Sequence, residues 1–125
     1  MLAGREIIGT IAVKDLGVAK KFYQGTLGLK LEDETGSEAH SYRSGNTRLI
    51  VYRSQFAGTN KATALNFMVG AELDNIVKGL RDRGVTFERY DMPEVKREGD
   101  VHVAGPMRMA WFKDPDGNIL CVMNQ

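Results

Sequence analysis

The chain has 125 residues, of which 42% are hydrophobic and 26% are charged, the balance of one compact folded domain and not of a disordered or fibrous protein. Seventeen basic residues against 16 acidic ones leave a net charge of +1, so no overall field favours nucleic acid or a membrane surface as a partner. No apolar stretch reaches the ~18 residues of a membrane span, no signal peptide is recognisable, and the single cysteine, Cys121, has no internal disulfide partner. We therefore expect a cytoplasmic protein.

An internal repeat organises the sequence. Residues 11–32 align with residues 67–88 without a gap, at a constant offset of 56 (67 minus 11), so that Gly28 meets Gly84 and Glu32 meets Glu88. Similarity of this length within one chain indicates a supersecondary unit that is used twice. We expect a single domain over residues 1–125 that contains two units, at about residues 6–54 and 62–124.

The first unit opens with a short, mostly apolar strand over residues 7–13. Asp15 is predicted to cap a helix that Gly28 ends, and the helix carries one apolar stripe for the core, formed by Leu16, Ala19, Phe22, Tyr23 and Leu27. Three strands follow, over residues 29–34, 40–43 and 48–53, with a hairpin turn at residues 44–47 between the last two.

A connector over residues 55–63 leads to the second unit, which repeats this order. A strand is expected over residues 64–69, then a helix ended by Gly84 with an apolar stripe of Leu73, Ile76, Val77 and Leu80. Strands are expected over residues 85–90, 107–113 and 119–122, with a turn at residues 114–117. Residues 91–106 are charged and contain proline and glycine, which favours a loop, either a flap over a binding site or a solvated segment.

Each unit therefore has the order β-α-β-β-β. Antiparallel strands with one helix per unit predict an α+β fold in which each sheet packs one face on its helix. The other face of a twisted sheet can line a cup, which is a natural place for a small molecule.

Several stretches resemble the glyoxalase / bleomycin resistance protein / extradiol dioxygenase superfamily, also called vicinal oxygen chelate proteins. They are Ile11-Ala-Val-Lys-Asp-Leu16, Phe22-Tyr23, Leu27-Gly28-Leu29 and Trp111-Phe-Lys-Asp-Pro-Asp-Gly-Asn118, and the similarity extends over about residues 6–124. The resemblance implies a glyoxalase-like curved-sheet fold. It also implies homodimers, with cups completed across the subunit interface.

Metal-using members of that superfamily hold a divalent ion through His, Gln or Glu on four strands. The corresponding positions here are Ile8, Ala64, Val51, with a register uncertainty of one residue, and Cys121. Three of these side chains have no lone pair to donate, and one thiolate does not make a site. We therefore expect no metal and no cofactor. The alternative is a metal held by His40, His102 and one carboxylate, built from the strand over residues 40–43 and the loop over residues 91–106.

Strand alternation predicts the lining of the cup, because residues two apart share a face. The four former ligand positions are taken as inward, and the resemblance adds residues on the third strand of each unit. The predicted ligand-binding residues are Thr10, His40, Tyr42, Leu49, Val51, Arg53, Asn66, Met68, Met109, Trp111, Cys121 and Met123. Methionine adapts to irregular ligands, and tryptophan offers a flat face for stacking. In the alternative reading, Trp111 is a core aromatic and Arg53 a solvated cation at the rim.

These residues indicate a metal-independent member of the superfamily that binds a small apolar or aromatic molecule, as bleomycin resistance proteins sequester their drugs. The chief alternative is a metal-dependent lyase, isomerase or dioxygenase. A third hypothesis is metal-free catalysis in which His40 and Tyr42 exchange protons and Arg53 assists. The sequence leaves open whether the protein is an enzyme.

Overall fold

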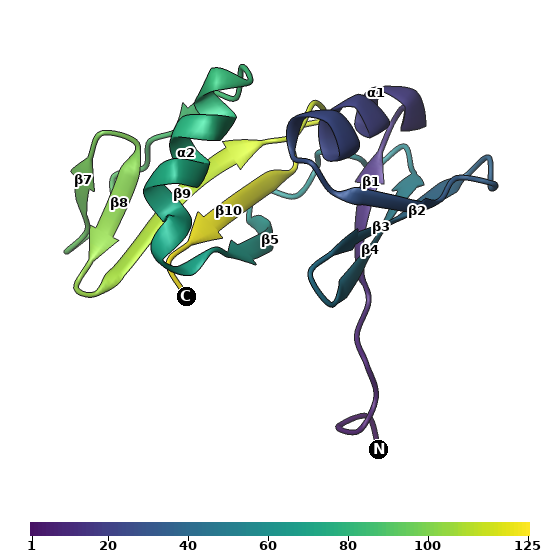
Figure 1. Cartoon of the computed structure of the whole chain (residues 1–125), viewed down its shortest axis with the longest axis horizontal. Coiled ribbons are helices and arrows are strands. Elements are labelled where there is room, and N and C mark those ends of the chain that lie inside the picture. Colours follow the sequence, from purple (N-terminus) through teal and green to yellow (C-terminus); the bar gives the residue numbers. More distant parts are fainter. The chain divides into compact units, whose positions relative to one another are not determined.

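The structure, a computed structural model, describes all residues from Met1 to Gln125. The chain forms two compact units, Met1–Gly58 and Thr59–Gln125. Their boundary lies inside the segment that was predicted to connect the two halves of the repeat. Each unit combines a mixed sheet with helical segments, which confirms the predicted α+β fold (Figure 1).

Unit one has the predicted β-α-β-β-β order. Its elements are β1 (Gly9–Val13), α1 (Leu16–Lys20) with its π-helical continuation η1 (Lys21–Thr26), β2 (Lys30–Asp33), β3 (Ala39–Ser44) and β4 (Thr47–Arg53). The strands lie in the order β1-β4-β3-β2, with β1 parallel to β4. The helical segment begins as predicted, because Asp15 Oδ1 accepts hydrogen bonds from the backbone N–H groups of Gly17 (2.8 Å) and Val18 (3.0 Å).

The core of unit one lies between the helical segment and one face of this sheet. Tyr23 on η1 and Tyr42 on β3 are both fully buried, with ring centroids 6.1 Å apart. Val51 on β4 and Val13 on β1 are also fully buried. Tyr23, which the helical stripe placed in the core, is therefore a core residue.

Unit two contains more strands than predicted. Its elements are β5 (Thr63–Met68), the 3-10 helix η2 (Gly70–Glu72), α2 (Leu73–Asp82), β6 (Phe87–Glu88), β7 (Lys96–Glu98), β8 (Val101–Ala104), β9 (Met107–Lys113) and β10 (Ile119–Met123). The strands lie in the order β5-β10-β9-β8-β7, and β6 also pairs with β9. Helix α2 crosses one face of the sheet (Figure 1) and buries Leu73, Val77 and Leu80. Ile76, which was assigned to the same stripe, is 37% exposed.

The prediction of a loop over residues 91–106 is wrong for its second half. Strands β7 and β8 form a hairpin there, with Arg97 opposite His102, and β8 continues the sheet by pairing with β9. Gly99 supplies the positive φ (63°) that the turn requires. The charged residues of β7 are exposed and suit the edge of a sheet, where charge discourages pairing with another chain.

The turn between β9 and β10 is organised by Asp114, which is only 5% exposed. Its Oδ1 accepts the backbone N–H groups of Asp116 (3.0 Å) and Asn118 (2.8 Å), and its Oδ2 accepts Nδ2 of Asn118 (2.8 Å). Gly117 has φ +93°, which a residue with a side chain rarely adopts. The Asp-Pro-Asp-Gly-Asn motif therefore joins two central strands through a turn that hydrogen bonds within the motif stabilise.

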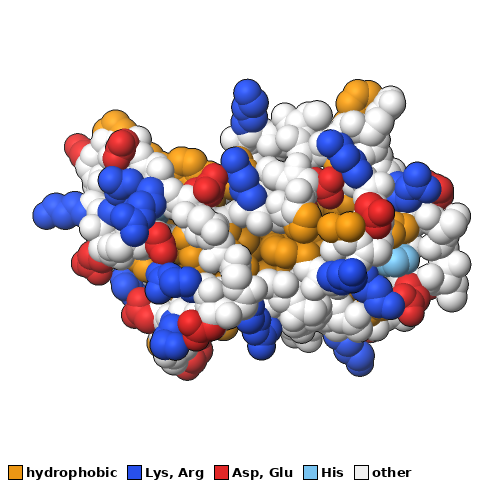
Figure 2. All heavy atoms as spheres, turned by 90° about the horizontal axis from the view of Figure 1, so that it is seen from above, with side chains coloured by type: hydrophobic (Ala, Val, Ile, Leu, Met, Phe, Trp, Pro, Cys, Tyr) orange, Lys and Arg blue, Asp and Glu red, His pale blue; other side chains and the backbone are white.

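No single sign of charge dominates the face drawn in Figure 2. Figure 2 shows basic and acidic side chains interspersed over the face in view, with hydrophobic side chains visible between them. This distribution agrees with the net charge of +1. None of the helices has both the length and the apolar character needed to cross a membrane.

Candidate functional site

The unit-two sheet has one face that α2 covers and one that it does not. Arg108 on β9 pairs with Asp74 of α2 at 3.0 Å, which identifies the covered face. Because strand residues alternate, Trp111 on β9 lies on the opposite side. We call this side the helix-free face; the register places on it Asn66, Met68, His102, Met109, Trp111, Cys121 and Met123.

Two rows of side chains cross the helix-free face. Asn66, Cys121 and Trp111 are direct neighbours on β5, β10 and β9. Two residues further along, the second row consists of Met68, Met123, Met109 and His102. All six residues that the sequence predicted in this unit therefore share one face. Their roles in binding stay predictions.

Trp111 is held in place by polar and aromatic contacts. Its Nε1 donates a hydrogen bond to Thr63 Oγ1 at 3.0 Å. Its ring is nearly perpendicular to the rings of Tyr90 and His102, with centroid distances of 5.6 Å and 4.9 Å and interplanar angles of 75° and 86°. The side chain is only half-buried, so it combines a fixed position with an accessible surface. These are the properties of an aromatic stacking platform.

Sequence reasoning considered His102 only as a metal ligand and did not place it among the ligand-binding residues. The residue is completely buried on β8, and its Nε2 accepts a hydrogen bond from the backbone N–H of Tyr90 at 2.9 Å. The alternation of Val101, His102 and Val103 would have indicated a strand and placed the histidine on one face. The charged residues before it favoured a loop, and the histidine was therefore not assigned to the site.

Cys121 is buried between Asn66 and Trp111 and is 1% exposed. Burial raises the pKa of its thiol from 9.0 to about 11, because the interior disfavours the thiolate. The thiol therefore remains protonated near neutral pH, and its Sγ donates a weak hydrogen bond to the carbonyl oxygen of Val122 at 3.5 Å. A neutral thiol is a poor metal ligand.

We expect Cys121 to make stability depend on alkaline pH. A folded-state pKa above the unfolded value means that the thiol's contribution is fully present below about pH 9 and is lost as the pH rises towards 11. Urea unfolding across this range should show a steeper fall for the native sequence than for Cys121→Ala. Iodoacetamide should label the thiol in urea and leave it unmodified in the folded protein. Equal labelling of both states would contradict a buried thiol.

In unit one, the structure does not bring the predicted residues onto one face. Thr10 pairs with Ile50, so it lies on the side of the sheet away from Tyr42, Leu49 and Val51. The latter three lie on the side that packs on the helical segment and are buried. The prediction that Thr10 shares a face with the β3 and β4 residues is therefore wrong. The assumed register was off by one residue, and such a shift moves every side chain of a strand to the other face.

His40 and Tyr42, the candidates for acid–base chemistry, both lie on the buried side of β3. Burial raises the pKa of the Tyr42 phenol, and its Oη makes no hydrogen bond. His40 Nδ1 is likewise buried without a partner. No proton relay connects the two side chains, so this geometry does not support the catalytic hypothesis.

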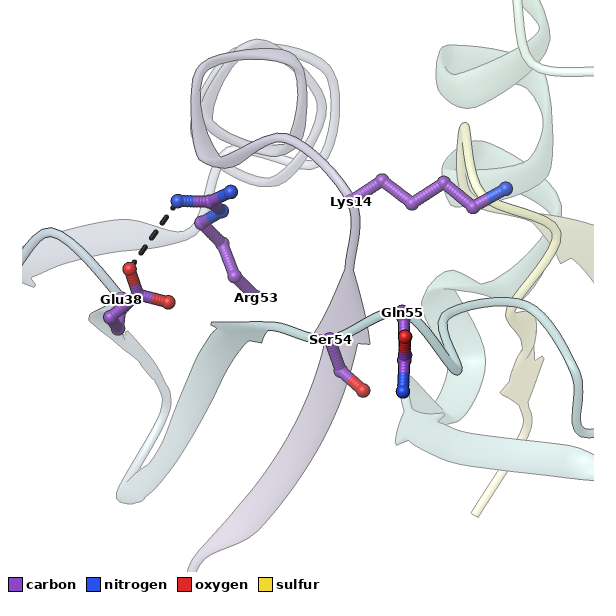
Figure 3. A pocket seen from close by; sticks show the side chains of 5 residues that line it. All are labelled: Lys14, Glu38, Arg53, Ser54 and Gln55. Carbon is purple, nitrogen blue, oxygen red and sulfur yellow. Dashed lines mark hydrogen bonds and ion pairs between the residues drawn. The ribbon is translucent and has the colours of Figure 1, made fainter.

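Arg53 lies at a pocket of about 380 Å³ that is lined by Lys14, Glu38, Arg53, Ser54 and Gln55 (Figure 3). Its Nη1 is 3.3 Å from Glu38 Oε1, and its side chain is 53% exposed, as expected for a solvated cation at the rim. Figure 3 shows Lys14 extending away from this pair. The charged groups of the pocket therefore do not converge on one point.

The sequence matches the family described as the Glyoxalase/Bleomycin resistance protein/Dioxygenase superfamily over residues 7–122. The chain belongs to this superfamily. No curated protein matches this superfamily member significantly.

Solved structures that resemble this superfamily member have the same fold. A glyoxalase family protein from Enterococcus faecalis has a TM-score of 0.74 and 19% identity, with 98% of this chain and 99% of that chain covered. Lactoylglutathione lyase from Agrobacterium tumefaciens has a TM-score of 0.72 and 16% identity, covering 98% and 95%. The genomically encoded fosfomycin resistance protein FosX from Listeria monocytogenes has a TM-score of 0.69 and 17% identity, covering 100% and 93%.

The residues of this superfamily member do not fit the divalent-metal ligand set that the resemblance implied. Ala64 has no donor and lies beside an irregularity in the pairing of β5 with β10. Val51 faces the helical segment, and the residue before it, Ile50, also lacks a donor. No group of three or more His, Cys, Asp or Glu side chains is arranged to hold a metal ion.

Proposed function

We propose that this superfamily member binds a small apolar or aromatic molecule on the helix-free face without using a metal. The observation that supports this most directly is the half-buried Trp111 on the same sheet face as Met109, Met123 and Met68. A fixed aromatic ring gives a ligand a flat surface, and unbranched thioether side chains adapt to its outline.

The donor chemistry favours metal-independent binding. Divalent ions need oxygen or nitrogen ligands, whereas the positions in question carry isoleucine, alanine and valine. The remaining position, Cys121, is a protonated thiol in the interior. No observation favours the metal-dependent lyase, isomerase or dioxygenase. The similar structures, at 16–19% identity, show the fold and not the activity.

The proposal includes a homodimer in the cytoplasm. The superfamily resemblance supports the dimer, and a single unpaired cysteine fits a reducing compartment.

The test uses the full chain purified without chelator. Elemental analysis should find no stoichiometric transition metal. Titration with naphthalene should quench the fluorescence of the only tryptophan saturably, with the same affinity before and after treatment with EDTA. Stoichiometric nickel, zinc, iron or manganese, or an affinity that EDTA abolishes, would overturn metal independence. A signal that naphthalene does not change would overturn binding at this face.

A further inference from the structure

His102 has a buried polar atom that nothing in the chain satisfies. The residue is 0% exposed, and its Nδ1 makes no hydrogen bond. Buried polar side-chain atoms are nearly always paired, because leaving one unpaired loses the hydrogen bonds it would make with water. An unpaired atom of this kind beside a proposed ligand face therefore calls for a partner from outside the chain.

The hydrogen bond at the other ring nitrogen determines what Nδ1 offers. Because Nε2 accepts the backbone N–H of Tyr90 at 2.9 Å, it carries a lone pair. In a neutral imidazole the hydrogen then lies on Nδ1. His102 thus presents a hydrogen-bond donor, and its partner must carry an acceptor atom.

The neighbours of His102 define the rest of that partner. The imidazole lies 4.9 Å from the Trp111 ring, centroid to centroid, and beside Met109 on the adjacent strand. A ligand stacked on Trp111 would have its edge close to the imidazole. Met109 is half-buried and unbranched, so its side chain can shift at low cost to admit an acceptor atom.

We propose that Nδ1–H of His102 donates a hydrogen bond to an acceptor oxygen of the bound molecule, and that the ligand class is aromatic compounds carrying a carbonyl group. This inference rests on the proposed function, because it assigns the polar contact of the same face. It makes His102 a specificity-determining residue: a ring without the acceptor would leave the donor unpaired in the complex.

The test compares two probes of the same shape, 2-acetylnaphthalene and 2-isopropenylnaphthalene, which differ in having C=O or C=CH₂. The full chain should bind the ketone about tenfold more tightly, the factor expected for one buried hydrogen bond. In His102→Phe the ratio of the two affinities should fall to about one, whatever the variant does to binding in general. Phe56→Ala, which removes an exposed side chain outside the helix-free face, should keep the ratio of the native chain.

Nitrogen NMR of the native chain keeps the proposal testable if His102→Phe does not fold. The His102 ring should show the Nδ1–H tautomer, and its Nδ1 signal should shift on addition of the ketone and not of the hydrocarbon. Equal affinities for the two probes, or an Nε2–H tautomer, would overturn the role of His102 and leave the proposed function standing. Failure of both probes to bind would overturn the proposed function and this inference with it.

Discussion

Replacing Asp114 by alanine is expected to lower the free energy of unfolding by about 3–5 kcal/mol, since hydrogen bonds to a charged group contribute ~1.5–3 kcal/mol each and do not add fully. The substitution removes three hydrogen bonds and leaves the backbone N–H of the buried Asn118 without its partner. Urea denaturation followed by circular dichroism measures the change.

Asp91→Ala is the matched control. The Asp91 side chain is 95% exposed, and its contact with Arg97 is 3.3 Å long. Exposed ion pairs contribute little, so this variant should stay within about 0.5 kcal/mol of the native chain. Equal stabilities of the Asp114 and Asp91 variants would show that the turn does not depend on the buried carboxylate.

Trp111→Ala is expected to weaken the binding of naphthalene at least tenfold, because stacking on an aromatic ring contributes ~0.5–1.5 kcal/mol beyond the area it buries. The variant also loses the hydrogen bond to Thr63, so stability should fall as well. Because the substitution removes the only tryptophan, calorimetry must replace fluorescence as the measure of affinity.

Phe56→Ala removes an aromatic side chain that is 67% exposed and lies outside the helix-free face. It should bind naphthalene like the native chain. Unchanged affinity in the Trp111 variant, or an equal loss in both variants, would show that the ligand does not stack on Trp111.

Local chemistry made the order of the elements predictable. Asp15 caps a helical segment, Gly28 and Gly84 take the positive φ that ends one, and Asp114 to Gly117 form a turn. Each signal acts within a few residues of the chain, so the sequence alone reveals it. The repeat then indicated that the same unit occurs twice.

The sequence did not show clearly which face of β3 and β4 points to the core. Strand β4 contains Leu49, Ile50, Val51 and Tyr52 in succession, and a run that is apolar on both sides does not identify the core face. On β3, Ser41 and Arg43 flank Tyr42, and this alternation of polar and aromatic residues indicates that Tyr42 is on the core face. The tyrosine belongs to the core because Tyr23 of the helical segment lies against it.

The sequence by itself determined the repeated β-α-β-β-β plan, the caps and turns, and the absence of donor side chains at three of the four expected metal positions. Only the tertiary structure decided which face of unit one is buried, that residues 96–104 extend the second sheet, and that His102 lies beside Trp111. The physical reason is the distance along the chain over which each interaction acts. Caps and turns depend on neighbours in the chain, whereas sheet register and the partners of a buried imidazole depend on strands that meet only when the chain folds.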